Sequence, residues 1–274
     1  MKENLDPKVV AGFGDEWVRF DQTGMSGDEL QMHFDSYFSI FPWAKLPVEA
    51  TGFDLGCGSG RWAKLVAPRV GKLHLIDPSD AIDVARRNLI EFDNCEFHRA
   101  GVDAIPLPDN SCDFGYCLGV LHHIPDTESG LRAAVSKLKS GSPFLLYLYY
   151  RFDGKPWWFR LIWRTTDLAR RLICRLPHPI RYGMSQILAA LIYWPLAKIA
   201  YYLELLGLNV RNFPLGQYRN SSFYRMRTDA LDRFGTSLEQ RFTKTEIRQM
   251  METCGLADIE FSDVSFWTAV GIKL

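Results

Sequence analysis

Three kinds of sequence feature are missing, and each absence narrows the function. The six cysteines form no C-x-x-C pair, so we expect reduced thiols, no disulfide and no bound metal. The first ten residues, MKENLDPKVV, contain no apolar run of signal-peptide length. We therefore expect a cytoplasmic protein, with any membrane association peripheral and at the inner face. No Gly-Lys-Ser or Gly-Lys-Thr occurs, which excludes a Walker A phosphate loop.

The chain also has no net charge, but the charges cancel only over its whole length and not within each segment. Lys and Arg number 32 and so do Asp and Glu. Residues 1–43 carry three basic and eight acidic side chains, whereas residues 151–211 carry ten basic and three acidic ones. The chain therefore has an acidic N-terminal arm and a basic segment late in its length.

Short apolar runs alternate with helical spacing between residues 52 and 150. Such alternation predicts βαβ units and a mostly parallel sheet. It resumes at TKTEIRQMMETCG, where Thr243 and Glu246 predict a capping box and Gly255 a helix end, and two closing strands follow. We expect an α/β fold: a Rossmann-like, mostly parallel seven-stranded sheet with an antiparallel C-terminal hairpin, plus a helical insertion. The predicted parts are an N-terminal helical lid or arm over 1–43, a core over 44–151 and 240–274, and the insertion over 152–239.

The stretch FDLGCGSGRW, residues 53–62, predicts a loop in which a ligand lies against bare backbone. Read from Gly58, it also fits a dinucleotide fingerprint, so a nicotinamide-dependent oxidoreductase is one alternative. Asp54 stands just before the loop, where a carboxylate would repel a pyrophosphate and suit an ammonium group. Asp77 and Asp103 follow the next two predicted strands, which makes the cleft acidic.

The segments DLGCGSGRW, LHLIDPS and GVDAIPLPDNSCDFGYCLGVLHHIPD, with the final helix and hairpin, resemble the class I S-adenosylmethionine-dependent methyltransferase family. Within this family, these segments most resemble the small-molecule, ubiquinone-biosynthesis-type subgroup. The resemblance implies S-adenosyl-L-methionine as cofactor. It implies these cofactor-binding residues: Asp54, Gly56, Cys57, Gly58, Gly60, Arg61, Asp77, Pro78, Ser79, Val102, Asp103, Leu118 and Gly119. It also implies that the N-terminal arm is a lid, with Trp17 and Phe20 as candidates for closing the cleft.

His122 and His123 follow the fourth predicted strand and are the catalytic candidates, because histidine is the usual base near neutral pH. The alternative is that one packs on the sheet while the other caps the next turn. A metal role is not expected, since no third ligand stands near the pair in the sequence.

The insertion alternates aromatics with arginine and continues into an apolar stretch. We rank a cap with a substrate role first, contact of residues 152–210 with a membrane surface second, and nucleic acid third. A homodimer face is a further alternative. The loop expected over 214–242 supplies candidate acceptor contacts besides Trp17: Tyr218, Arg219, Asp232, Arg233 and Arg241.

The leading prediction is a methyltransferase acting on a small-molecule, lipid-like or sugar-derived acceptor. The absence of Asn-Pro-Pro-Tyr and Asp-Pro-Pro-Tyr argues against methylation of nucleic-acid base amines. Besides the oxidoreductase, the other alternative is a non-catalytic, membrane-associated binding protein with a relic cofactor pocket.

Overall fold

The structure is a computed structural model that describes residues 4–152, 155–263 and 267–274. The chain forms two compact units. The first contains Met1–Gln22, Leu30–Arg151 and Leu238–Leu274, and the second contains Thr23–Glu29 and Phe152–Ser237. The arm expected over 1–43 therefore contributes residues to both units.

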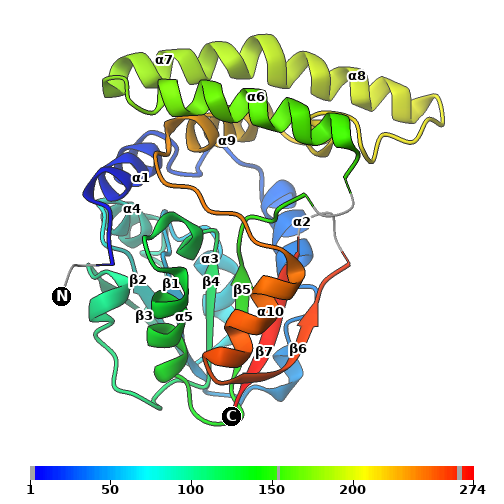
Figure 1. Ribbon diagram of the computed structural model, residues 1–274. Helices are drawn as coiled ribbons and strands as arrows, with labels where there is room; N and C mark the ends of the chain where they lie inside the picture. Colours follow the sequence, from blue (N-terminus) through cyan, green and yellow to red (C-terminus); the bar gives the residue numbers. More distant parts are fainter. Residues whose placement is uncertain (1–3, 153–154, 264–266) are drawn as a thin grey trace. The chain divides into compact units, whose positions relative to one another are not determined.

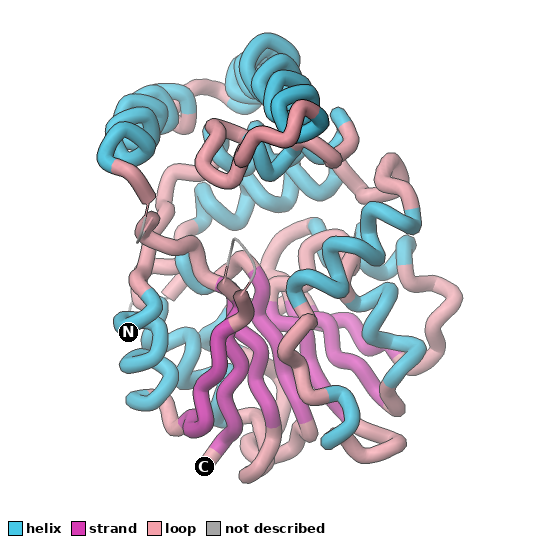
Figure 2. Tube along the Cα trace, turned by 90° about the vertical axis from the view of Figure 1, so that its right-hand side faces the viewer, coloured by secondary structure: helices cyan, strands magenta, loops and turns pink. Residues whose placement is uncertain are grey.

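The first unit is built on one seven-stranded sheet (Figures 1 and 2), in the order β3-β2-β1-β4-β5-β7-β6. The strands are β1 (Thr51–Leu55), β2 (Lys72–Ile76), β3 (Cys95–His98), β4 (Phe114–Leu118), β5 (Pro143–Tyr147), β6 (Leu256–Phe261) and β7 (Thr268–Lys273). The first five run parallel, and β7 runs antiparallel to both β5 and β6. This confirms the predicted fold class. The antiparallel hairpin also stands where a dinucleotide-binding fold would place its second half.

Two apolar clusters cover the two faces of this sheet. The alternation along β5 separates them, because Phe144 and Leu146 belong to one cluster while Leu145 belongs to the other. The first cluster includes side chains of α5 (Thr127–Ser136) and α10 (Lys244–Thr253). The second includes side chains of α2 (Gly27–Tyr37), α3 (Ala63–Val66) and α4 (Ala81–Asn88). Strands buried on both faces read as continuous apolar runs, as FLLYLYY does.

Local signals in the sequence place the last helix of the first unit correctly. The Thr243 hydroxyl accepts a hydrogen bond from the Glu246 amide at 3.1 Å, and the Glu246 carboxylate accepts one from the Thr243 amide at 2.7 Å. This is the predicted capping box. Gly255 follows the helix with φ +90°, a conformation that favours glycine.

The second unit is helical. It contains α6 (Trp157–Ile173), α7 (His178–Leu188), α8 (Trp194–Leu205) and α9 (Phe223–Gly235). A π-helical turn over Ala189–Tyr193 joins α7 and α8 into one rod (Figure 1). Side chains of this rod and of α9 share an apolar cluster that includes Ala189, Tyr193 and Phe234.

Helix α9 corrects the sequence analysis, which expected a loop over 214–242. The Ser222 hydroxyl caps the helix by accepting from the Arg225 amide at 3.2 Å. Met226, Ala230 and Phe234 recur every four residues and are all buried. That spacing buries one face of a helix. It specifies a helix even though the residues between those positions are polar.

Removal of the Thr243 hydroxyl tests the capping box. We expect Thr243→Val to lower the free energy of unfolding by about 1 kcal/mol, because the Glu246 amide at the start of α10 loses its hydrogen-bond acceptor. Thr243→Ser keeps a hydroxyl and should stay close to the wild type. Denaturant unfolding of both variants measures the difference, and equal losses in the two would contradict a capping role.

Candidate active site

The glycine loop begins where β1 ends, and its backbone requires glycine. Gly56, Gly58 and Gly60 have φ values of +77°, +54° and +77°, which side chains rarely adopt. A Cβ on Gly56 would lie 2.3 Å from the Val120 side chain, and one on Gly58 would lie 3.0 Å from the Trp17 ring. The loop is therefore shaped to expose its backbone.

Asp77, at the end of β2, fastens this loop. Its carboxylate accepts hydrogen bonds from the Gly58 amide at 3.0 Å, the Ser79 amide at 2.9 Å and the Ser79 hydroxyl at 2.6 Å. Burial raises the pKa of Asp77, and the bonds from Ser79 and Gly58 oppose that rise. Four lone-pair sites serve these three donors, so acceptor capacity remains for a ligand.

Asp54 lies beneath the loop and is almost completely buried. Its Oδ2 has no hydrogen-bond partner among the residues that the structure describes. Burial raises the pKa of this carboxyl to about 8, against the lowering effects of Tyr116 and Arg61. A buried acid with one unpartnered oxygen suits a cationic ligand group in its neighbourhood and does not suit a pyrophosphate.

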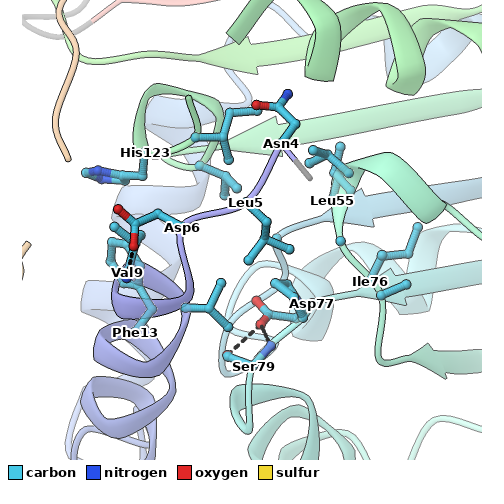
Figure 3. Close-up of a pocket in the computed structure, with 18 of the residues that line it drawn as sticks. Asn4, Leu5, Asp6, Val9, Phe13, Leu55, Ile76, Asp77, Ser79 and His123 are labelled. Carbon is cyan, nitrogen blue, oxygen red and sulfur yellow. Dashed lines mark hydrogen bonds between the residues drawn. The ribbon is translucent and has the colours of Figure 1, made fainter. Parts of the chain in front are cut away.

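A cavity of about 770 Å³, its open mouth included, lies at the carboxyl ends of the strands. Figure 3 shows Asp77 and Ser79 on one side of it, with His123 and the N-terminal residues on the other. The predicted cofactor residues that line it are Gly56, Asp77, Pro78, Ser79, Val102, Leu118 and Gly119.

The other predicted cofactor residues stand behind this lining. Cys57 is buried, and burial raises the pKa of its thiol well above the usual range. The Arg61 guanidinium lies over the rings of Trp17 and Trp62, at 5.5 and 4.4 Å from their centroids. Asp103 accepts a hydrogen bond from the backbone of Asn4. Their predicted contacts with the cofactor stay predictions.

The N-terminal arm supplies one wall of the cavity. Helix α1 (Pro7–Arg19) contributes Val9, Val10, Phe13 and Trp17 to the lining, together with Asn4, Leu5 and Asp6 before it. The Asn4 side chain pairs with the backbone of Asp126 through two hydrogen bonds of 2.7 Å. Phe20 is buried and does not line the cavity.

Sequence reasoning identified Trp17 in this wall and missed the other α1 residues. Val9, Phe13 and Trp17 recur every four residues, which is the signal of one helical face. Asp6 also caps the helix, since its carboxylate accepts from the Lys8 amide at 2.8 Å.

The two adjacent histidines have different surroundings. His123 lines the cavity, and its Nδ1 lies 2.7 Å from the Leu238 carbonyl. Only a protonated nitrogen can donate to a carbonyl, so the neutral His123 carries its lone pair on Nε2. His122 is fully buried, stacks on Tyr149 at 3.9 Å between ring centroids and does not line the cavity. Burial lowers the pKa of His122 well below its usual range, so its ring is neutral.

The predicted acceptor contacts, apart from Trp17, are engaged elsewhere within their own units. In the first unit, Arg241 pairs with Glu239 at 2.8 Å and lies over the Tyr149 ring. In the second, Arg219 pairs with Glu204 at 2.6 Å, and Tyr218 is buried against Tyr193.

The remaining two acceptor candidates lie at the end of α9. Asp232 accepts from Thr236, and Arg233 lies 3.9 Å from Asp167. Contact of these side chains with an acceptor therefore stays a prediction.

One group among the described residues could hold a metal ion: His74, Glu96 and His98. They share a face of β2 and β3, where His74 pairs with Glu96 in register. His74 Nδ1 lies 3.0 Å from His98 Nε2, and Lys72 binds the Glu96 carboxylate at 2.6 Å. Because this ammonium neutralises the single carboxylate and none of the three lines the cavity, we keep the expectation of no metal in the site.

Comparison with known proteins identifies the family. Residues 53–146 match the family model described as methyltransferase domain. A ubiquinone biosynthesis O-methyltransferase of Nitrosomonas europaea is 29% identical over 57% of this chain and 72% of its own length. A ubiquinone/menaquinone biosynthesis C-methyltransferase of Hahella chejuensis is also 29% identical, over 38% of this chain and 47% of its own length. Together these matches support a class I S-adenosylmethionine-dependent methyltransferase.

Solved methyltransferase structures share the fold. Human N-acetylserotonin methyltransferase, solved with S-adenosylmethionine, has a TM-score of 0.54 at 16% identity over 95% of this chain and 56% of its own. A candidate methyltransferase of Bacillus halodurans has a TM-score of 0.50 at 17% identity, over 85% of this chain and 71% of its own. At such identities the likeness concerns the fold alone. The family membership replaces the oxidoreductase alternative.

S-adenosylmethionine is the cofactor of this family, and the residues present fit it. The glycines leave backbone amides for its carboxylate, and the Asp77 carboxylate retains lone pairs for its ribose hydroxyls. The uncompensated Asp54 carboxyl is the observation of this structure that a cationic ligand explains.

The raised pKa of Asp54 predicts that the folded, unliganded protein becomes less stable as the pH rises. The pKa of Asp54 in the folded state is about 8, whereas that of a free aspartate carboxyl is about 4. Because the folded state binds more protons in that interval, this group makes stability fall as pH rises towards 8. We expect Asp54→Asn to raise the melting temperature relative to the wild type, by an amount that grows between pH 5 and pH 8.

Thermal unfolding across this pH range measures the effect, with the exposed Asp93→Asn as control. The same variant should lose part of the stabilisation that S-adenosylmethionine gives the wild type. A difference between Asp54→Asn and wild type that does not change with pH would contradict the buried-carboxyl assignment.

Proposed function

We propose that this methyltransferase acts on a lipid-like small molecule that carries a hydroxyl on an apolar body. The observation that carries the proposal is that the predicted cofactor residues and His123 line the same cavity. Its wall from α1 is apolar, since Val9, Val10 and Phe13 face it. An apolar acceptor gains free energy on entering such a wall, whereas a sugar would lose hydrogen bonds to water.

The names of the relatives agree with this acceptor class. Two curated relatives are named for ubiquinone biosynthesis, one as an O-methyltransferase and the other as a C-methyltransferase. Quinone precursors combine a ring hydroxyl with an apolar body. We therefore place the acceptor among phenol-like molecules, with oxygen as the methylated atom.

The bound cofactor supplies a methyl group on a positively charged sulfur. The chain positions the reactants and excludes water. The loop and Asp77 hold the donor, and α1 with Asn4 keeps water from the same cavity. Positioning of two reactants is the largest contribution that such an enzyme can make to a displacement reaction.

His123 is the group that we propose as proton acceptor. Its Nδ1–H donates to the Leu238 carbonyl, which leaves Nε2 to accept the proton of an acceptor hydroxyl. The turn that carries it is fixed, since Gln240 donates to the carbonyls of His122 and Ile124 at 2.9 and 2.7 Å. His122 then acts as a packing residue beneath it.

Direct assay tests the proposed function. Mass spectrometry of small molecules that purify with the protein, followed by turnover assays on alkylated phenols, should show a product heavier by one methylene group together with S-adenosylhomocysteine. Asp77→Ala should abolish cofactor binding in calorimetry, because both the loop and the ribose lose their acceptor. Asp80→Ala, an exposed acid nearby, should bind normally. Unchanged affinity in Asp77→Ala would contradict the site, whereas intact cofactor binding with turnover only on sugars would contradict the acceptor class.

The histidine pair makes a separate prediction. We expect His123→Ala to lower kcat by about 10²-fold or more, the usual contribution of a general base, with cofactor affinity unchanged. His122→Phe preserves an aromatic stack on Tyr149 and should lower kcat by less than about tenfold, because that residue does not line the cavity. Equal losses in the two variants would show that the pair acts through packing.

A further inference from the structure

The second unit exposes an unusual amount of apolar side chain. Most of the large apolar side chains that the described residues expose lie between Trp157 and Phe223. Trp157 and Leu191 are each 71% exposed, and Leu206 is 76% exposed. Soluble monomers rarely leave a contiguous surface of this kind uncovered, so it indicates an interaction site.

Helix α6 presents two parallel stripes. The apolar stripe contains Trp157, Leu161, Leu168 and Leu172, all exposed. Arg160, Arg164, Arg171 and Arg175 repeat the same spacing three residues further on, and all are exposed. Three residues turn an α-helix to a position about 60° from the starting direction, so the arginines border the apolar stripe along its length.

These arginines carry charge that the unit does not compensate. Among the described residues, Arg160, Arg164 and Arg175 have no ion-pair partner. Arg171 lies 2.9 Å from the Asp167 carboxylate, which it shares with Arg170. No acidic residue occurs between positions 168 and 203. The two buried arginines of this segment have an internal role, since Arg170 and Arg181 donate to the Thr236 and Gly235 carbonyls at 2.7 and 3.0 Å.

The rod formed by α7 and α8 adds a second exposed stripe. Its exposed side chains include Ile180, Met184, Ile187, Leu191 and Trp194, spaced alternately four and three residues apart. The opposite face is buried, with Ser185, Ala189, Tyr193 and Ala197 recurring every four residues. One side of the rod is thus already packed within the unit.

We propose that α6 and the α7–α8 rod form a surface that docks on an anionic lipid bilayer, lying in the interface. Helices that lie in a membrane interface carry tryptophan and leucine on one stripe with basic residues beside them. The two exposed stripes of α6 have this pattern and contain no acidic residue. The arginines meet lipid phosphates, while the leucines enter the acyl boundary. This inference concerns the second unit alone and does not depend on the acceptor.

Two other occupants fit the charges and contacts less well. A second copy would bring the uncompensated arginines of both chains together with few acids to pair with them. His178–Leu205 is a 28-residue helix long and apolar enough to cross a bilayer by length and composition, in the part of the chain that the structure describes. Its buried face carries Arg181 and Ser185, which a spanning helix would have to expose to lipid or to repack.

Vesicle co-sedimentation of the full chain tests the proposal. We expect partition onto vesicles of phosphatidylcholine with phosphatidylglycerol, weaker partition onto phosphatidylcholine alone, and weakening with salt. Arg160→Glu with Arg164→Glu should weaken partition about thirtyfold or more, since each basic residue contributes roughly fivefold. Leu168→Glu with Leu191→Glu should weaken partition onto both vesicle types.

The matched control is Val48→Glu with Ile90→Glu, two apolar positions of the first unit that are more exposed than Leu168 and Leu191. It should partition as the wild type does. Circular dichroism and S-adenosylhomocysteine binding confirm that each variant is folded.

Three outcomes would overturn the proposal. The first is no partition onto either vesicle. The second is a dimer in lipid-free solution that Leu191→Glu dissociates, together with no vesicle binding, which would assign the surface to a second copy. The third is retention in membranes after alkaline carbonate extraction, which would indicate a spanning helix.

Discussion

The cofactor pocket depends on one buried carboxylate, that of Asp77. By accepting from the Gly58 and Ser79 amides, it ties the loop after β1 to the turn after β2. The Ile76 carbonyl adds a second tie, since it accepts from the Gly56 amide at 2.7 Å. These bonds hold the glycines in conformations that expose their backbone, so the acid that we predict to face the cofactor also builds the surface predicted to bind it. A pocket assembled in this way is largely preformed, which reduces the entropy lost on binding.

The two acids of the site differ in their surroundings, and so do the two histidines. Asp54 and Asp77 are both nearly inaccessible, but donors surround Asp77 while Asp54 Oδ2 has none among the described residues. The instability that we predict from the raised pKa of Asp54 is typical of functional sites, where stability is given up for binding. His122 and His123 are neighbours in sequence, yet only His123 reaches the cavity. Their chain order gave no reason to choose between them.

The second unit shows why amphipathic pattern and surface must be considered together. Composition alone indicated a basic, aromatic-rich segment with several competing roles. The structure separates the arginines of this segment: Arg170 and Arg181 satisfy carbonyls at the end of α9, while Arg160, Arg164, Arg171 and Arg175 are exposed near exposed leucines. That sorting depends on which helical face is buried against α9, and the polar residues of α9 had concealed its own helix from a reading of the sequence.

The sequence by itself determined the parts governed by local rules and short spacing. These were a mostly parallel sheet that closes with an antiparallel hairpin, the glycine loop, the capping box of α10 and the acids after successive strands. Such features follow from periodicity, turn chemistry and hydrogen bonds between near neighbours. Only the tertiary structure decided that α1 lines the cavity, that Asp54 is buried at the end of β1 and that Arg241 lies over the Tyr149 ring. Those outcomes depend on contacts between distant segments, and burial sets the energy of a charge only after the chain has closed around it.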